Sequence, residues 1–341
     1  MKGISLQQPG AFAMVDLPEP APPGPGEVRV RVHRVGICGT DYSGYLGRMP
    51  FYSYPRIPGH ELGVEVLAVG PGVTNVRPGD RCAVEPYLNC GHCVACRRGG
   101  SNCCANLQIL GIHTDGGLRQ ELNLPARKLH PSARLSYDQL ALVETLGIGG
   151  HAVARANPQP DDTVLVIGAG PIGLSVIQSA HLTGARVIAL DLDKQRLARC
   201  RQMLGVTDTV LATGVAANLR ALEELTRGDL VNIVIDATGN HKSMAHALKA
   251  VAPTGKLVFV GIAPAPVALE SLLLHRREVT VLASRNSLPT DFTRIIRQIE
   301  TGSINTQQWL THIAGFDEFI TIFPAWLKPE TGVIKAMVHL P

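Results

Sequence analysis

The second half of the chain alternates two hydrophobic patterns. Short runs rich in Val, Ile and Leu, typical of buried parallel strands, alternate with longer stretches whose apolar positions recur at helical spacing. Strands joined in this way by crossover helices predict a doubly wound parallel sheet, an α/β fold. The predicted strands are 163–167, 186–190, 208–211, 231–235, 256–260 and 279–283, and the predicted helices are 171–183, 193–204, 215–227, 241–250 and about 268–275.

The first 150 residues follow a different pattern. Segments 28–32, 63–69 and 80–84 are short runs of strand type, the first alternating apolar and polar residues, and Pro-Gly turns separate them. This arrangement predicts an irregular, mostly β domain. Near Asp138 the pattern becomes helical and leads into the second domain.

Beyond residue 285 the chain leaves the strand–helix alternation. Thr290 is placed to cap an amphipathic helix that ends at Ile299, and 333–340 has the pattern of a last strand. Because the parallel sheet is already complete, we expect this tail to return to the first domain. The predicted domains are therefore 1–150 together with 286–341, and 151–285.

The first strand of the predicted parallel sheet ends in a glycine-rich turn. A Gly-x-Gly-x-x-Gly motif stands between this strand and the next helix, and the second strand ends in Asp191. This context predicts a dinucleotide site at the helix N-terminus; the alternative is a glycine turn in a domain that binds no nucleotide. Asp191 favours NAD over NADP, because a carboxylate binds the ribose hydroxyls and repels a 2′-phosphate. The predicted cofactor residues here are Gly168, Gly170, Pro171, Ile172, Gly173 and Asp191.

Composition restricts the class of protein. The 341 residues are 45% hydrophobic and 18% charged, which is typical of a globular chain with two domains. The net charge is only +4 and the basic residues are scattered, so we expect no nucleic-acid partner. The N-terminus lacks a signal pattern and no run of 18 apolar residues occurs, so we expect a cytoplasmic protein with no membrane partner.

Five of the eight cysteines stand in one short loop. Cys90, Cys93 and Cys96 are each three residues apart, and Cys104 follows eight residues later. Four thiolates can close around zinc as a tetrahedron with no open position, so the predicted site is structural. Cys103 is a rival for the fourth ligand. The alternative is a set of reduced loop thiols without metal.

A second group of metal-ligand residues is dispersed. Cys38 lies in Gly-Ile-Cys-Gly-Thr-Asp, and His60 and Glu61 lie in Pro-Gly-His-Glu. One thiolate, one imidazole and one or two carboxylates suit a catalytic zinc with an exchangeable position. Spacing alone does not show that these residues converge, and a lone Cys or His is more often structural.

Taken in this order, the motifs resemble the zinc-dependent medium-chain dehydrogenase/reductase family, which contains the alcohol and polyol dehydrogenases. The resemblance covers essentially the whole chain. It implies a GroES-like catalytic domain built from both termini, which encloses a Rossmann domain. It selects Cys104 over Cys103 as the fourth structural ligand. It also implies a catalytic zinc on Cys38 and His60, with Glu61 as a direct or exchangeable ligand.

The resemblance further indicates a branch of the family. In the sorbitol and polyol branch, the remaining ligand is a Glu about 24 residues before the first cofactor glycine, and Glu144 lies 24 residues before Gly168. This position implies the polyol, sugar-acid and threonine dehydrogenase group, in which the Glu often binds zinc through water. The branch usually has Glu-Pro, whereas Thr145 follows here.

Further residues match roles in the family. Thr40 corresponds to the hydroxyl that hydrogen-bonds the reacting oxygen, and Asp41 is expected to hold the loop under the zinc. Ser43 stands where many members have a His that ends the proton relay, which implies a shorter relay, exit through water or a different base. Arg196 matches a basic residue near the adenosine ribose. Lys335 matches a basic residue that can reach the pyrophosphate from the tail.

The predicted function is therefore a zinc-dependent oxidoreductase that transfers a hydride between NAD and a secondary alcohol of a polyol, sugar acid or hydroxy amino acid. It would hold one catalytic and one structural zinc. The resemblance implies a homodimer or homotetramer. The alternatives are a simple primary or aromatic alcohol dehydrogenase, and a non-catalytic nucleotide-binding protein on the same fold. Candidate substrate contacts are Tyr45, Arg48, Phe51, Tyr54 and His113.

Overall fold

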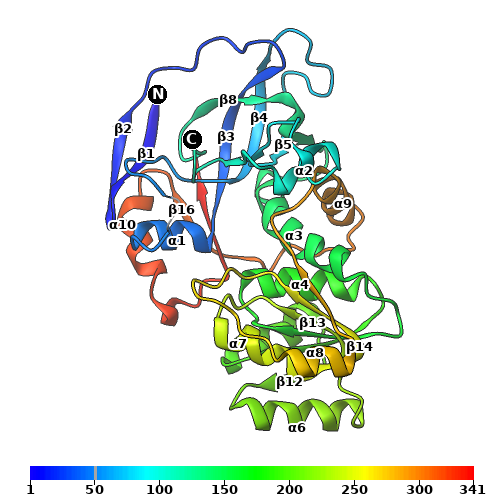
Figure 1. Ribbon diagram of the computed structural model, residues 1–341. Coiled ribbons are helices and arrows are strands. Elements are labelled where there is room, and N and C mark those ends of the chain that lie inside the picture. The colour runs from blue at the N-terminus through cyan, green and yellow to red at the C-terminus, as the bar shows by residue number, and fades with distance from the viewer. Residues whose placement is uncertain (50–51) are drawn as a thin grey trace. The chain divides into compact units, whose positions relative to one another are not determined.

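The computed structural model describes residues 1–49 and 52–341, and the chain divides into two compact units (Figure 1). Unit 1 contains Met1–Glu144 and Leu288–Pro341, and unit 2 contains Thr145–Ser287. The segment after residue 287 thus belongs to the same unit as the N-terminal part of the chain. Phe51 lies outside the described residues.

Unit 2 is built on one parallel sheet. Its strand order in the described chain is β12-β11-β10-β13-β14-β15, with every neighbouring pair parallel. The order reverses between β10 and β13, and ligands bind at the carboxyl ends of strands beside such a reversal. The predicted α/β class and doubly wound sheet are confirmed. The strands are β10 (Thr163–Ile167), β11 (Arg186–Asp191), β12 (Asp208–Leu211), β13 (Val231–Asp236), β14 (Val251–Phe259) and β15 (Thr280–Ala283).

The crossover helices of unit 2 have identifiable ends. The Asp193 side chain accepts the backbone N–H of Gln195 and caps α5, which ends at Gly205 in the left-handed region. The Asn240 side chain caps α7 in the same way, accepting the N–H groups of Lys242 and Ser243. The helices are α4 (Pro171–His181), α5 (Lys194–Leu204), α6 (Val215–Thr226), α7 (His241–Ala247), η3 (Leu248–Ala250) and α8 (Ser271–Arg277).

Unit 1 is built around a mostly antiparallel sheet whose path in the described chain is β16-β17-β3-β4-β5-β9, with β8 also on β3. In β3 the residues Val28, Val30 and Val32 are fully buried, as the period-two pattern predicts. The red C-terminal strand β17 pairs antiparallel with β3 (Figure 1). The strands are β3 (Glu27–Ile37), β4 (Glu61–Val69), β5 (Arg81–Val84), β8 (Glu121–Pro125), β9 (Leu129–Pro131), β16 (Leu310–Gly315) and β17 (Lys335–His339).

Shorter elements of unit 1 surround this sheet. The pairs β1–β2 and β6–β7 form two small antiparallel ribbons. Helix α3 contains the boundary between the units, after Glu144. The elements are β1 (Lys2–Gln8), β2 (Ala11–Asp16), α1 (Gly39–Tyr45), β6 (Tyr87–Leu88), α2 (Val94–Arg97), η1 (Ser101–Cys103), β7 (Gln108–Ile109), η2 (Ala126–Lys128), α3 (Tyr137–Ala156), α9 (Pro289–Glu300), α10 (Phe319–Trp326) and η4 (Pro329–Thr331).

One predicted helix boundary is wrong. Helix α9 begins at Pro289 with Leu288 as its N-cap, so Thr290 does not cap it. Proline suits the first helical position because the N–H that it lacks has no partner inside the helix. The Asp291 carboxylate, in the first turn, reaches back to accept the backbone N–H of the N-cap residue Leu288 at 2.8 Å. None of the described helices is long and apolar enough to cross a bilayer.

Candidate functional site

The register of two strands brings Cys38, His60 and Glu61 together. Cys38 directly follows β3, Glu61 begins β4, and Gly36 lies opposite Glu61 in the antiparallel pair. One ligand atom from each of the three residues lies within 4.8 Å of the others. A side chain at Gly36 would meet this group, since a Cβ there would lie 2.1 Å from Glu61 Oε2. The fold therefore supplies the convergence that spacing could not show.

Asp41 lies next to Cys38 and His60 of this cluster. Its Oδ2 accepts the backbone N–H of Cys38 at 2.9 Å, and its Oδ1 lies 4.0 Å from His60 Nδ1. Burial alone would lower the pKa of His60, but Asp41 and Cys38 outweigh it and raise that pKa well above its ordinary value. Because Nδ1 faces Asp41, Nε2 is the ring nitrogen left for a metal. Asp41 thus contacts the loop and the imidazole, in line with the holding role expected of it.

Glu61 has a second partner that its motif does not reveal. The buried ammonium of Lys335 lies 2.6 and 2.9 Å from the two Glu61 oxygens, and 3.4 Å from the carbonyl oxygen of Ile37. Burial alone would lower the pKa of Lys335, but the charges of Glu61 and Cys38 raise it. Lys335 is therefore beside the metal-ligand cluster in unit 1. Its contact with a pyrophosphate stays a prediction.

Glu144 lies in the same buried region but outside the group of three. Its Oε1 accepts the hydroxyl hydrogen of Tyr87. Burial raises the pKa of Glu144, His60 opposes that rise, and Glu61 adds to it, so the acid senses both residues. Its ligand oxygens do not complete the set that converges within 4.8 Å. This arrangement suits an acid that reaches a metal through water. Tyr87 belongs to no recognisable motif, and the sequence did not predict it as a site residue.

Of the residues expected to act on a substrate, Thr40 and Tyr45 lie on helix α1. Thr40 Oγ1 lies 3.8 Å from Cys38 Sγ, so its hydroxyl is close to the ligand cluster. Tyr45 instead packs in the apolar core, with its ring stacked on Phe12 at 5.3 Å. The hydroxyl of Tyr54 donates to the carbonyl oxygen of Gly44.

The remaining candidate contacts are also accounted for. Arg48 is exposed. His113 Nδ1 accepts the backbone N–H of Ile109 at 3.1 Å, which fixes its ring against its own loop. Ser43 lies half-buried on α1, where its carbonyl oxygen accepts the N–H of Arg48. A contact of Arg48 or His113 with substrate stays a prediction.

The four loop cysteines converge in unit 1. One sulfur from each of Cys90, Cys93, Cys96 and Cys104 lies within 4.8 Å of the others. The Sγ atoms of Cys93 and Cys96 are 3.5 Å apart, as are those of Cys90 and Cys104. A tetrahedron with Zn–S bonds of about 2.3 Å has S–S edges of about 3.8 Å, so the cage has the size that zinc requires. Cys103 is exposed and outside this group.

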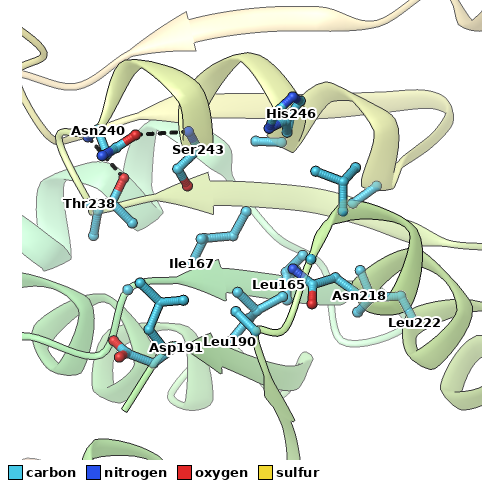
Figure 2. A pocket seen from close by; sticks show the side chains of 18 of the residues that line it. Leu165, Ile167, Leu190, Asp191, Asn218, Leu222, Thr238, Asn240, Ser243 and His246 are labelled. Carbon is cyan, nitrogen blue, oxygen red and sulfur yellow. Dashed lines mark hydrogen bonds between the residues drawn. The ribbon is translucent and has the colours of Figure 1, made fainter.

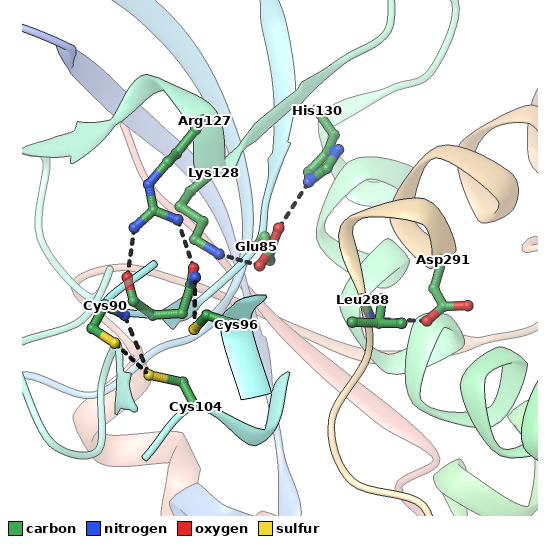
Figure 3. A network of polar contacts seen from close by, with 10 residues as sticks. Glu85, Cys90, Cys96, Cys104, Arg127, Lys128, His130, Leu288 and Asp291 are labelled. Atoms are coloured by element: carbon green, nitrogen blue, oxygen red, sulfur yellow. Dashed lines mark hydrogen bonds and ion pairs between the residues drawn. The ribbon is translucent and has the colours of Figure 1, made fainter. Parts of the chain in front are cut away.

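Hydrogen-bond donors surround the sulfurs (Figure 3). Backbone N–H groups of Cys90 and Ala105 point at Cys104 and Cys93, at 3.3 and 3.5 Å, and the Asn89 amide points at Cys96 at 3.5 Å. The Ala105 and Cys96 N–H groups lower the pKa of the Cys93 thiol to about 6. Thiolates are the form that binds zinc, so the donor set fits that metal.

The carboxyl ends of β10 and β11 open into a pocket of about 520 Å³ in unit 2. Figure 2 shows Asp191 and Leu190 on one side of it and Thr238 and Asn240 on the other. The predicted cofactor residues Gly168, Gly170, Asp191 and Arg196 all line it. Pro171, Ile172 and Gly173 form the first turn of α4 beside it.

Two of the three glycines of the turn are required by its geometry. Gly168 has a φ of 92°, which favours glycine. A Cβ on Gly173 would lie 1.7 Å from the Gly168 carbonyl oxygen, so only glycine lets α4 pack this closely on β10. A Cβ on Gly170 would lie no closer than 3.8 Å, to the Arg196 guanidinium. Gly170 is therefore not required by packing, which fits a role in approach to a ligand.

Asp191 faces the pocket and also holds the glycine turn. Its Oδ2 accepts the Ala169 N–H at 2.6 Å, and its Oδ1 accepts the Asp193 N–H at 2.8 Å. Each carboxylate oxygen can accept a further hydrogen bond. The Arg196 guanidinium lies 3.9 Å from Asp191 Oδ2. The pocket thus combines a carboxylate, a cation and a helix N-terminus, the features expected around a dinucleotide.

Two known protein families match segments of this chain. The family described as alcohol dehydrogenase GroES-like domain matches residues 24–134, and the family described as zinc-binding dehydrogenase matches residues 171–301. The chain is 36% identical to L-galactonate-5-dehydrogenase of Escherichia coli (strain K12), covering 99% of this chain and 98% of that protein. It is 33% identical to L-arabinitol 4-dehydrogenase of Aspergillus oryzae, covering 92% and 86%.

A solved structure agrees over the whole chain. It is described as a short chain alcohol dehydrogenase from Escherichia coli CFT073 complexed with NADH, and it matches with a TM-score of 0.91 and 28% identity over 99% of each chain. The resemblance inferred from the motifs is confirmed. The chain belongs to the zinc-binding dehydrogenases of the alcohol dehydrogenase family.

Proposed function

We propose that the chain is a zinc- and NAD-dependent dehydrogenase that oxidises a secondary alcohol of a polyol, sugar acid or hydroxy amino acid. The observation that carries this proposal is the convergence of Cys38, His60 and Glu61 within 4.8 Å. This donor set suits a catalytic zinc with an exchangeable position for substrate. A non-catalytic nucleotide-binding protein would have no need of this cluster.

Different residues of this chain have different roles in the proposed reaction. A zinc ion on Cys38 and His60 would supply Lewis acidity, and NAD would accept the hydride. The Thr40 hydroxyl, 3.8 Å from Cys38 Sγ, hydrogen-bonds the reacting hydroxyl and passes its proton toward water. Asp41 orients the His60 ring, and Lys335 holds the Glu61 carboxylate.

We also propose that Cys90, Cys93, Cys96 and Cys104 hold a structural zinc. The sulfur spacing and the backbone donors around it support this assignment. Four protein thiolates leave no position for substrate, so the site would hold the loop and take no part in the reaction.

NAD is the cofactor that Asp191 favours. Its carboxylate lies on the pocket wall, where it can accept the ribose hydroxyls and would repel a 2′-phosphate. The first turn of α4, Pro171 to Gly173, directs its N-terminal N–H groups toward the pyrophosphate. Arg196 lines the same pocket, 3.9 Å from Asp191 Oδ2, and so lies beside the ribose position.

The relatives support a polyhydroxylated substrate. Their names specify a sugar acid oxidised at carbon 5 and a polyol oxidised at carbon 4, both of them secondary alcohols on a linear chain. Glu144 supports the same branch over a simple primary or aromatic alcohol dehydrogenase. The deciding experiment is an NAD-reduction screen with L-galactonate, L-arabinitol, threonine and benzyl alcohol. We expect turnover with one of the first three; turnover confined to benzyl alcohol would overturn the substrate class.

We further propose a cytoplasmic homodimer or homotetramer. Among the described strands, β15 pairs only with β14, and Val281 on it and Leu272 on α8 are 39% and 72% exposed. An unpaired edge with apolar side chains suits pairing with a second copy. None of the eight cysteines, all of which lie in the described part of the chain, forms a disulfide, which suits a reducing compartment. Sedimentation of the purified chain tests the assembly: a monomer at micromolar concentration would contradict it.

A further inference from the structure

Tyr87 links the loop of four cysteines to the acid that lies beside the catalytic cluster. The side chain is 2% exposed, and its hydroxyl donates a hydrogen bond to Glu144 Oε1. Glu144 is also buried, so the contact joins two polar groups that water does not reach freely. When a hydrogen bond fixes one oxygen of a buried carboxylate, the direction in which the other oxygen points is restricted as well.

Tyr87 is held by its strand and by a neighbouring ring. Its backbone pairs with Ile109 in the β6–β7 ribbon, and the Pro86 carbonyl oxygen accepts the N–H of Leu110 at 3.1 Å. The ring packs edge-on against fully buried Phe292, with centroids 6.4 Å apart and planes at 73°. Tyr87 is therefore a donor with little freedom to turn.

The packing continues to a buried ion pair. Phe292 stacks on His130 with centroids 4.8 Å apart, and His130 Nε2 lies 3.3 Å from Glu85 Oε2. Figure 3 shows Glu85 between His130 and Lys128, beside the cysteines. Residues 85, 87 and 89 thus each make a polar contact, to Lys128, Glu144 and Cys96 respectively. The segment that leads into the cysteine loop carries the donor for Glu144.

A donor is needed here because anionic groups crowd the site. Cys38 and Glu61 lie in the same region as Glu144, and the buried ammonium of Lys335 is already engaged by both Glu61 oxygens. A hydroxyl that donates to a carboxylate stabilises it without adding charge. With Oε1 occupied by Tyr87, Oε2 is the Glu144 oxygen available to a metal or to its water.

We propose that Tyr87 is a positioning residue, whose hydroxyl fixes Glu144 so that Oε2 faces the cluster of Cys38 and His60. This inference rests on the proposed function, because it assumes that this cluster holds a metal. Tyr87 belongs to none of the sequence motifs that point to the site.

The test uses the full-length protein with cobalt(II) in the catalytic site, because the visible absorption of cobalt reports its ligand geometry. Tyr87→Phe removes one hydroxyl and keeps the ring. Tyr137→Phe is the matched control, since Tyr137 begins the same helix about two turns before Glu144 and stacks on His33. We expect a changed cobalt spectrum and a kcat lower by about tenfold, with KM changed less, in Tyr87→Phe only.

The same substitution made in a Glu144→Gln variant shows whether Tyr87 acts through Glu144. In Glu144→Gln, adding Tyr87→Phe should change the cobalt spectrum and kcat no further, because the two changes interrupt one interaction. A wild-type spectrum in Tyr87→Phe, or fully additive effects with Glu144→Gln, would overturn the proposal. If the wild-type chain takes up no metal at Cys38 and His60, the proposed function itself fails, and metal content separates that outcome from the others.

Discussion

Lys335 Nζ lies 2.6 Å from one oxygen of Glu61 and 2.9 Å from the other, across 274 residues of sequence. Both side chains are buried, so each charge depends on the other. The pair restrains an acid that stands next to His60 and is a candidate metal ligand. A bound metal that recruited Glu61 would have to draw it away from this ammonium, which favours Glu61 as an exchangeable ligand.

Lys335→Met should strongly destabilise the protein. It leaves a buried carboxylate without its partner, for which we expect a loss of about 3–5 kcal/mol in the free energy of unfolding. Urea unfolding of the zinc-loaded protein measures it. Adding Glu61→Gln should recover part of the loss, because the unpaired charge is then removed. Equal stability of wild type and Lys335→Met would show that the pair is not stabilising.

Cys38→Ser should abolish turnover and leave the nucleotide pocket intact. The thiolate is a proposed ligand in unit 1, whereas the pocket is formed by unit 2 alone. We expect metal content to fall by about one ion per chain and kcat by about a thousandfold or more. NADH binding, measured by its fluorescence, should be unchanged. Retained turnover would refute the metal assignment.

Cys104→Ser and its neighbour Cys103→Ser should behave differently. Cys104 is buried in the group of four sulfurs, whereas Cys103 is exposed and outside it. Cys104→Ser should lose the structural metal and lower the melting temperature, since binding to such sites contributes directly to folding. Cys103→Ser should match wild type in metal content and melting temperature. The reverse order would mean that the fourth ligand has been misassigned.

Asp191→Ser should weaken NAD binding for two reasons. It removes the proposed ribose acceptor, and it also removes the acceptor for the Ala169 N–H in the glycine turn. We expect KM for NAD to rise by about tenfold or more, and the ratio of NADP to NAD activity to increase. Steady-state kinetics with both cofactors tests this. An unchanged cofactor ratio would exclude Asp191 as the discriminating residue.

Two glycines of the same turn should fail in different ways. Gly173→Ala places a Cβ 1.7 Å from the Gly168 carbonyl oxygen, so we expect a loss of folded protein. Gly170→Ala meets nothing closer than 3.8 Å, so the protein should fold normally but bind NAD weakly, because the backbone can no longer approach the pyrophosphate. Thermal unfolding and NADH titration distinguish the two. Normal NAD binding by Gly170→Ala would contradict the phosphate position.

The strands of unit 2 could be predicted because parallel strands are buried on both faces and leave continuous apolar runs. Only β14 was misplaced, since it begins at Val251 and includes Pro253 and Gly255, which are unusual in strands. In the tail, β16 and α10 were missed. β16, at the edge of its sheet, alternates half-buried and exposed residues, but His312 is half-buried and Ile313 is exposed, so no apolar–polar alternation marks it; α10 contains Pro324, which argues against a helix.

The residue pattern alone predicts only those parts of the candidate site whose residues lie close together along the sequence. The four cysteines lie within one loop, so their spacing carries the geometry. Cys38 and His60 meet through the register of β3 and β4, which spacing does not encode, and only the family resemblance joined them. Tyr87 reaches Glu144 across 57 residues and follows no pattern, because a hydrogen bond between distant side chains leaves no periodic signal.

The pairing of β17 with β3 sets an order of events during synthesis. A ribosome releases Thr145–Ser287 as a continuous stretch, so this unit can fold while the chain is still growing. Unit 1 has to wait, because the strand beside β3 emerges only after the whole of Thr145–Ser287. Until then Glu61 lacks its ammonium, which arrives on β17. The nascent chain therefore keeps the Cys38 cluster unfinished until all of unit 2 has been synthesised.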